Sequence, residues 1–423
     1  SGTWRHGSHV AGLLAASTDN STGIASSAFN CSIMSVKVSD ENQSSNDVGI
    51  TDGFAGILYA AKAGFYSEGF SIINNSWGGG GYSNYENGVI NTCVNEYNAI
   101  IVCSGGNGTS GWNELYEISY PAGYENSVSV CPLGTNNSWG HWATYHESVD
   151  LAAPGEDIYS CTTPNSYTNM TGSSMSSPIA ASVFGLLKSY HMDWSNDMVR
   201  TMVLATADPV IYNTNQENYL DGMLGNGRID SYKAISTPLF PKIEYSGEDM
   251  LIINDSDGNI NPGESIELTV ILFNDPSWGQ ATNATGTLVC LNPDVSINNQ
   301  TVNFGNIASG DVGMNIESPF QINFNSTFDG SEAEFYLYFS SNQNDYVEYT
   351  ISIPITFAVE EVPIIPGDLN QDSIINILDV VQLVNIILGN SEANNNQLIA
   401  GDLNLDSNLN VQDIIILINS ILQ

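Results

Sequence analysis

Positively charged side chains are scarce in this chain of 423 residues. Lys and Arg together number 8 against 46 Asp and Glu, which gives a formal net charge of −38. A surface this acidic repels polyanions, so neither nucleic acid nor anionic lipid is expected as a partner. Adaptation to solubility or salt is one explanation of this balance. The other is that some of the carboxylates bind divalent cations.

Long apolar runs are missing as well. No run approaches the roughly 18 to 20 residues of a membrane span, so none is expected. No signal peptide is visible, because the chain opens directly on a motif, and we expect its first residue to be a truncation or processing point. Cysteine is sparse. The six cysteines fit a secreted protein without proving disulfides, and Cys290, with no partner in its own domain, is expected to be a small buried apolar residue.

The first part of the chain, residues 1–238, alternates short apolar runs with helix-like patterns. This alternation is typical of an α/β fold with a parallel sheet and helices on both faces. The expected strands are Ser32–Val38, Ser71–Asn75, Ala99–Ser104 and Ser127–Cys131. The expected helices are Gly53–Ala63, Tyr85–Tyr97, Ser176–Tyr190 and Asn196–Leu204.

Two further parts follow, in keeping with the two or three domains that this length predicts at about 150 residues each. Residues 239–362 show period-2 patterns at Ser265–Leu272, Glu334–Phe339 and Tyr346–Ile353, which predict an antiparallel β-sandwich. Residues 363–423 contain an internal repeat, since GDLNQD at Gly367 recurs as GDLNLD at Gly401.

Three separated segments of the first part carry chemistry. HGSHVAG begins at His6, SGGNG at Ser104 and TGSSMSSP at Thr171. Serine hydrolysis needs a nucleophile, a base that takes its proton, and donors for the oxyanion. A Ser just before a long helix has the free N–H groups of that helix beside it. Each segment alone is more often structural, but their combination and order favour a hydrolase.

The three segments resemble those of the subtilisin family, which read HGTHVAG, AGN and GTSMASP. IINNSWGG at Ile72, YPAGYENSVSV at Tyr120 and DLAAPGEDIYS at Asp150 are similar to further family segments in the family order. The resemblance covers about residues 1–238 and implies a subtilisin-like fold with endopeptidase activity on polypeptides. It implies that His6 is the general base, Ser174 the nucleophile and Asn107 an oxyanion donor beside the Ser174 amide. His9 is expected to pack beneath the site.

One member of the family's triad has no counterpart by order in this chain. The family's triad carboxylate precedes the His by a few dozen residues, whereas only five residues precede His6. We therefore expect the catalytic Asp to lie outside these 423 residues and the chain itself to have little activity. The resemblance also implies a substrate pocket without charged side chains, suited to a neutral side chain. Its expected lining residues are Ser76, Trp77, Gly78, Ser104, Gly105, Gly106 and Ser119.

The terminal repeat carries a metal-binding pattern. Oxygen-bearing residues stand at positions 1, 3, 5, 9 and 12 of two loops, and position 7 supplies a backbone carbonyl, as in EF-hand calcium loops. The expected ligands are Asp368, Asn370, Asp372, Ile374, Asn376 and Asp379, then Asp402, Asn404, Asp406, Asn408, Asn410 and Asp413. Each loop runs into an apolar segment, VVQLVNIIL at Val380 and IIILINSIL at Ile414, which predicts a helix and so a small α-helical module. The loops resemble dockerin repeats, in which Asp ends the loop. Ser373 and Ser407 stand where EF-hand loops have the turn Gly.

This resemblance implies calcium as cofactor and a cohesin-like protein as a possible partner, although such repeats could also form only a calcium-stabilised end. The Asx-rich segment from Asn254 to Glu264 is either a further cation loop or an ordinary turn. The general sequence pattern of the sandwich, more than any motif, resembles that of Ig-like spacers of secreted proteins. Together these features favour a secreted or surface-attached endopeptidase. The alternative is a non-catalytic scaffold or adhesion protein with a degenerate protease domain.

Overall fold

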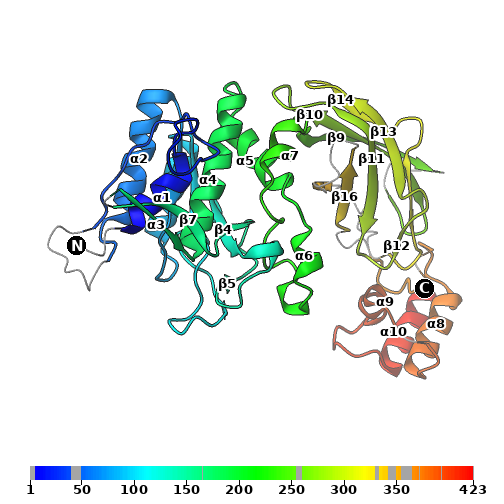
Figure 1. Ribbon diagram of the computed structural model, residues 1–423. Helices are drawn as coiled ribbons and strands as arrows, with labels where there is room; N and C mark the ends of the chain where they lie inside the picture. The colour runs from blue at the N-terminus through cyan, green and yellow to red at the C-terminus, as the bar shows by residue number, and fades with distance from the viewer. Residues whose placement is uncertain are drawn as a thin grey trace.

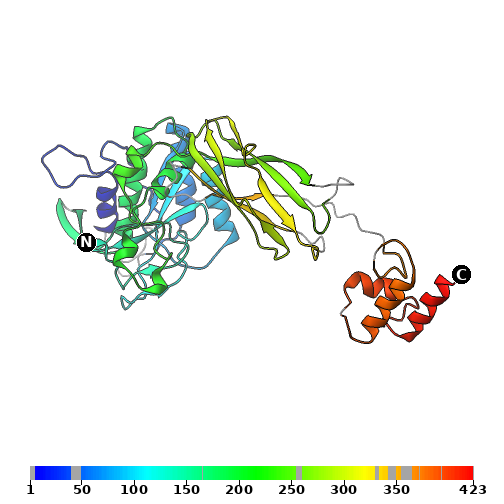
Figure 2. The same ribbon diagram turned by 90° about the vertical axis from the view of Figure 1, so that its right-hand side faces the viewer.

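The computed structural model of the chain describes residues 5–39, 49–163, 165–253, 260–328, 333–341, 349–353, 364–370, 372–391 and 393–422. These residues form an α/β body, a region of two antiparallel sheets and a terminal group of helices, which follow one another in space as they do along the chain (Figures 1 and 2). Within these ranges no helix is long and apolar enough to cross a membrane.

Four parallel strands form the central sheet of the α/β body. Their order is β1 (Ser71–Asn75), β2 (Ala99–Ser104), β4 (Ser127–Leu133) and β6 (Leu151–Pro154). Every residue of β2 and β4 is buried, as expected for parallel strands covered on both faces. Three of the four predicted strands are thus confirmed, and the buried strands end at the same edge of the sheet.

Helices cover both faces of this sheet (Figure 1). One face packs on α2 (Gly53–Glu68) and α3 (Asn84–Asn95). The other face packs on α4 (Ser173–Tyr190), α5 (Asn196–Ala205) and α7 (Ser231–Ser236). The smaller elements are α1 (Arg5–Ala15), β3 (Leu115–Tyr116), β5 (Thr144–Tyr145), β7 (Ile158–Thr162), β8 (Ser166–Met170), α6 (Ile211–Thr214) and 3-10 turns at Thr135–Asn137 and Asn218–Leu220. The predicted α/β layering is confirmed.

The predicted strand over Ser32–Val38 is wrong, because this segment pairs with no strand among the described residues. Its apolar alternation serves a different contact. The side chains of Val36 and Val38 lie against Gly56 of α2, where a Cβ would be 2.3 Å from Val38. Alternating side chains can pack on a helix without a strand, since a strand requires a hydrogen-bonded partner as well.

A half-buried carboxyl beside the central sheet predicts a pH dependence of stability. Asp150 accepts a hydrogen bond from Ser129 N at 2.7 Å, and burial raises its pKa to about 6, against about 3.9 in an unfolded chain. The folded state then holds a proton that the unfolded chain has lost, so stability falls as pH rises from about 4 to about 6.

The variant Asp150→Asn keeps an acceptor for Ser129 and removes this proton. Unfolding temperatures of the variant and the parent are measured from pH 4 to pH 7. The difference, variant minus parent, should increase between about pH 4 and about pH 6. A difference that stays constant over the whole range would contradict the assignment.

Two antiparallel sheets form the second region. Ordered by position, their strands are β9 (Ile243–Ile253), β10 (Ser265–Asn274), β11 (Ala281–Cys290), β12 (Val295–Ile297), β13 (Thr301–Ile307), β14 (Val312–Met314), β15 (Phe320–Phe324), β16 (Phe335–Ser340) and β17 (Tyr349–Ile353). One sheet runs β12-β15-β10-β14 with β9 on β10, and the other runs β13-β11-β16-β17. Alternate residues of β10 are buried, and a shared apolar core confirms the predicted antiparallel packing. An Ig-like topology remains a proposal.

The cysteines form no disulfide in this structure, since all six are free. Cys290 lies at the end of β11 and packs, half-buried, against the core of the two sheets. The predicted Asx-rich segment falls mostly on residues 254–259, outside the described residues. In the described part of this segment, residues 260–264, Asn261 N donates to Glu264 Oε2 at 2.7 Å.

The junction between the first two regions is tight. Phe240 is fully buried in the apolar cluster of α4 and α5, beyond the predicted boundary at residue 238. Its carbonyl accepts from Gly279 N at 2.9 Å, and Lys242 N donates to Asn274 Oδ1 at 3.1 Å. A Cβ on Gly279 would lie 1.7 Å from Leu239 O. The first residues after the predicted boundary therefore belong to the core of the α/β body.

The terminal region contains α8 (Ile377–Ile387), α9 (Asn395–Gly401) and α10 (Val411–Ile421). Its buried core consists of Leu369, Val380, Leu383 and Leu417. The two apolar helices predicted after the loops are confirmed as α8 and α10, and each begins at a capping box, closed by Asn376 or Asn410. The short α9 was not predicted.

Candidate functional site

The start of α4 is shaped by Gly172. Its φ of +156° suits glycine, and its N–H donates to Gly155 O at 2.8 Å. Ser173 is buried and Ser174 half-buried in the first turn that follows. The N–H groups of this turn have no partner within the helix and point at the space before it, so Ser174 carries both a hydroxyl and a free N–H there.

Asn107 faces this turn from the loop after β2. Its Oδ1 accepts from Ser173 N at 2.8 Å and from Ser173 Oγ at 2.9 Å, so Nδ2 is left free to donate. A methyl group placed on Gly172 would lie 3.5 Å from Asn107 Nδ2 and 3.7 Å from Ser174 N. Two N–H donors from distant segments thus border one small space.

His6 lies near the start of α1, and α1 packs directly against α4. His6 is exposed at its outer side, and partial desolvation, followed by the neighbouring His9, lowers the pKa of its imidazole. Among the described residues no carboxylate contacts His6, and no hydrogen bond joins His6 to Ser174. The Ser174 hydroxyl instead donates to Ser76 O at 3.3 Å. Catalytic hydrogen bonds are often longer or misaligned before substrate binds.

His9 has the packing position that was predicted for it. The side chain is fully buried, and Nε2 lies 3.0 Å from Ile158 O and 3.1 Å from Thr168 O. Since both oxygens are acceptors, Nε2 carries the proton. His9 therefore ties α1 to the β7–β8 hairpin.

The residues predicted to line the pocket form two neighbouring segments, Ser76–Gly78 and Ser104–Gly106, with Ser119 beside Gly78. Ser104 Oγ reaches both Asn75 O and Trp77 O at 3.4 Å. A Cβ on Gly78 would lie 2.6 Å from Ser119 Oγ. The ring of Trp77 is turned toward Phe54 of α2, with ring centroids 5.7 Å apart, so the backbone of residue 77 is the part that borders Ser104.

The glycines that follow Ser104 continue toward Ser173 and Ser174. Gly105 N donates to Val130 O at 2.9 Å, and Gly106 N donates to Ser173 Oγ at 3.2 Å. No room exists for a side chain at Gly106, because a Cβ there would lie 2.4 Å from Thr144 Oγ1. This segment thus joins the loop of Asn107 directly to the start of α4.

Sequence reasoning missed two polar residues in the same place. Asn74 at the end of β1 and Ser177 on α4 are hydrogen-bonded to each other at 2.7 Å, and Asn74 also contacts Ser76. Asn74 stands inside the quoted IINNSWGG segment, but its contact with α4 links residues 103 positions apart. Only the fold brings them together.

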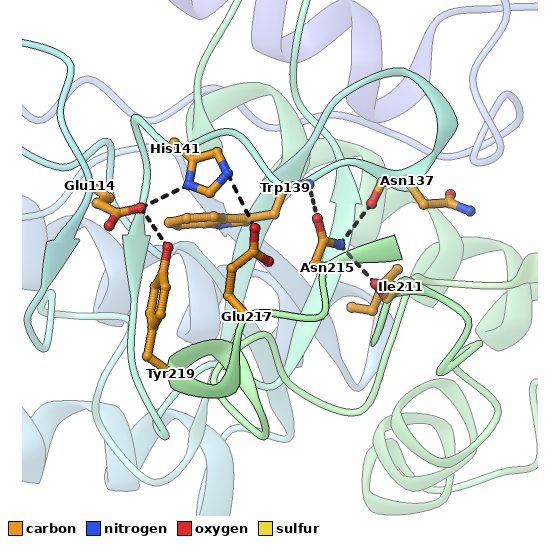
Figure 3. A network of polar contacts seen from close by, with 8 residues as sticks. All are labelled: Glu114, Asn137, Trp139, His141, Ile211, Asn215, Glu217 and Tyr219. Carbon is orange, nitrogen blue, oxygen red and sulfur yellow. Dashed lines mark hydrogen bonds and ion pairs between the residues drawn. The ribbon is translucent and has the colours of Figure 1, made fainter. Parts of the chain in front are cut away.

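A second polar network lies on loops of the α/β body (Figure 3). His141 Nδ1 is 2.9 Å from Glu114 Oε2, and Nε2 is 3.8 Å from Glu217 Oε1. Asn215 Oδ1 accepts from Trp139 N at 2.7 Å. These contacts join three loops, and in the described part of the chain no group of three or more His, Cys, Asp or Glu side chains is arranged to hold a metal ion.

The two terminal loops have the same internal geometry. Asp368 accepts from Asp372 N at 3.2 Å and from Ser373 N at 2.8 Å. In the second loop Asp402 accepts from Asp406 N at 3.0 Å and from Ser407 N at 2.8 Å. The oxygens at positions 1, 3 and 5 therefore line one tight turn, and their mixture of carboxylates and amides suits a hard cation.

Two features distinguish these loops from an EF-hand loop in which every ligand position serves only the cation. Ser373 and Ser407 have φ of +64° and +67°, the left-handed conformation for which EF-hand loops use Gly. The closing residues Asp379 and Asp413 are fully buried, and each accepts three backbone N–H groups. A carboxylate has about four lone-pair sites, so each keeps about one for a cation and mainly closes its loop.

Two parts of the chain are similar to known proteins. A profile of the subtilase family matches residues 2–227, and one of the dockerin type I domain matches residues 366–422. Thermitase of Thermoactinomyces vulgaris is 34% identical over 230 residues, 54% of this chain and 74% of that protein. A thermophilic serine proteinase of Bacillus sp. (strain AK1) is 34% identical over 231 residues, 55% of this chain and 52% of that protein.

Among solved structures, a protease of Pseudoalteromonas arctica PAMC 21717 is 25% identical, with a TM-score of 0.45 over 55% of this chain and 70% of that one. The family match covers more than half of the present chain and includes the segments of His6, Asn107 and Ser174. The chain therefore belongs to the subtilase family of serine proteases and ends in a dockerin type I domain.

Proposed function

We propose that the protein is a secreted endopeptidase that cleaves polypeptides through an acyl-enzyme on Ser174. His6 takes the Ser174 proton and later gives it to the leaving amine. The tetrahedral oxyanion is bound by Asn107 Nδ2 and the Ser174 N–H. The observation that supports this most is the pair of hydrogen bonds from Ser173 to Asn107 Oδ1, at 2.8 and 2.9 Å, which leaves Nδ2 beside the nucleophile.

The lining of the proposed pocket suggests its preference. Ser104, Gly78 and Ser119 present small neutral groups, and no charged residue belongs to the predicted set. A buried charge would need a counter-charge there. We infer that neutral side chains are accepted in preference to Lys or Arg.

The terminal domain is proposed to bind two calcium ions and to dock onto a cohesin-like protein. Asp368, Asn370, Asp372 and Asn376, with their counterparts Asp402, Asn404, Asp406 and Asn410, would supply side-chain oxygens. Ile374 and Asn408 would supply carbonyls. Calcium would neutralise these carboxylates and fix the loops, and docking would place the peptidase at an extracellular assembly.

The oxyanion role of Asn107 is open to a direct test. Asn107→Ala should lower kcat about 10² to 10³-fold with KM nearly unchanged, because the amide acts on charge that develops only in the transition state. The magnitude is that known for the corresponding donor of subtilisin itself, a member of this family. Steady-state kinetics on a peptide ester measure both constants.

Asn126→Ala is the matched control, since Asn126 also makes a side-chain hydrogen bond, to Asn91 at 2.8 Å, outside the site. An unchanged kcat in Asn107→Ala would contradict the oxyanion role. Activity that survives Ser174→Ala would contradict the proposed peptidase mechanism as a whole and favour a non-catalytic role for this chain.

A further inference from the structure

The carbonyl of the nucleophile lacks its normal helix partner. In an α-helix the carbonyl of residue 174 accepts from the N–H of residue 178, but residue 178 of α4 is a proline. Proline has no N–H, and its ring crowds the carbonyl four residues before it. Ser174 O is therefore turned away from the helix axis and needs a donor from elsewhere.

Ser76 supplies that donor. Its hydroxyl donates to Ser174 O at 2.9 Å, while the Ser174 hydroxyl donates back to Ser76 O at 3.3 Å. The two residues lie 98 positions apart and are joined in both directions. The orientation of the whole Ser174 residue, including the N–H that faces the oxyanion, thus depends on where the single proton of Ser76 Oγ points.

Asn74 decides the direction of that proton. Ser177 Oγ donates to Asn74 Oδ1 at 2.7 Å, which turns the amide so that Nδ2 donates to Ser76 Oγ at 2.9 Å. Because Ser76 Oγ already receives a proton from Asn74, its own proton is free only for Ser174 O. Ser177 is fully buried one turn beyond Ser174 on the same helix, so the chain of bonds starts and ends on α4.

We propose that Asn74 is a positioning residue of the peptidase. Through Ser76 it replaces the helix hydrogen bond that Pro178 removes and so holds the Ser174 N–H in line for the oxyanion. This inference rests on the proposed function, because it assigns a purpose to the geometry of Ser174 only if Ser174 is the nucleophile.

The test compares Asn74→Asp with Asn74→Ala. Asp has the same shape and can still accept from Ser177, but it accepts from Ser76 and draws the Ser76 proton away from Ser174 O. Both variants should acylate Ser174 about 10-fold more slowly, the size expected for one lost hydrogen bond, with KM within about twofold of the parent. The substrate is an activated p-nitrophenyl ester, whose acylation benefits from oxyanion donors even without a complete triad.

Asn126→Asp is the control, and unfolding temperatures are recorded for every variant. The double variant Asn74→Ala with Ser76→Ala should be no slower than Ser76→Ala alone, because Asn74 acts through Ser76. Normal acylation by a folded Asn74→Asp would overturn the proposal, and so would losses that multiply in the double variant. If Asn74→Ala does not fold, the acylation rates of Asn74→Asp and Ser76→Ala are sufficient to test the proposal. Retained hydrolysis in Ser174→Ala would instead show that the proposed function is wrong.

Discussion

Peptide hydrolysis by this 423-residue chain is expected to be about 10⁴ to 10⁵-fold slower than hydrolysis by a subtilase with a complete triad. Among the described residues no carboxylate contacts His6, and desolvation lowers the pKa of its imidazole. Without an orienting partner the ring tautomer is not fixed and the imidazolium is unsupported. The magnitude is that known for subtilisin, a member of this family, when its triad aspartate is removed.

Turnover of a peptide anilide by the purified chain measures this loss. Labelling of Ser174 by a fluorophosphonate, compared between the chain and its Ser174→Ala variant, shows how much nucleophilic reactivity remains. Rapid anilide hydrolysis that disappears in Ser174→Ala would mean that a carboxylate of this chain, in a part that the structure does not describe, serves His6.

Residues 363–423 alone should be unfolded in chelator and helical in calcium. Each loop gathers three side-chain oxygens within its first five residues. Among the described residues, the buried centre of the apolar cluster consists of four side chains, and the others that pack against it are partly exposed. A core of this size is marginal on its own. The binding energy of calcium would then appear as folding energy, because the unfolded chain has no preformed site.

Helical circular dichroism of this segment, followed as calcium is added and then chelated, gives the answer. Asp368→Ala together with Asp402→Ala should remove the response. Asn390→Ala, outside both loops and hydrogen-bonded to Asn385, should not. An identical helical signal with and without chelator would mean that the loops are not folding-coupled calcium sites, and the proposed role of calcium would fall.

Sequence patterns predicted those elements whose cause is local. The buried runs of β2 and β4 and the apolar stripes of α8 and α10 need no distant information, and they were placed within a few residues. Ser32–Val38 has the same kind of pattern, yet it forms no strand, because pairing depends on a partner elsewhere in the chain. The short α9 was missed because its capping box at Asn394 precedes no apolar stripe.

The residues of the candidate site also fall into those with a local sequence signal and those without one. His6, Asn107 and Ser174 stand in motifs, so their segments could be read directly, although their roles remain proposals. Asn74 and Ser177 could not be found, because a hydrogen bond between residues 103 positions apart leaves no local signal. The significance of Pro178 was hidden for the same reason, since the donor that compensates for it lies just beyond β1.

If the terminal domain docks as proposed, the tight junction at Phe240 has a mechanical consequence. Phe240 is buried in the same apolar cluster as Phe184 of α4, and its carbonyl is bonded to Gly279 of the sandwich. A pulling force on the sandwich would therefore enter the peptidase at its core and not through a slack tether. It would act on the helix whose first turn carries Ser174, so a load on the terminal domain would reach the geometry of Ser174 through this helix.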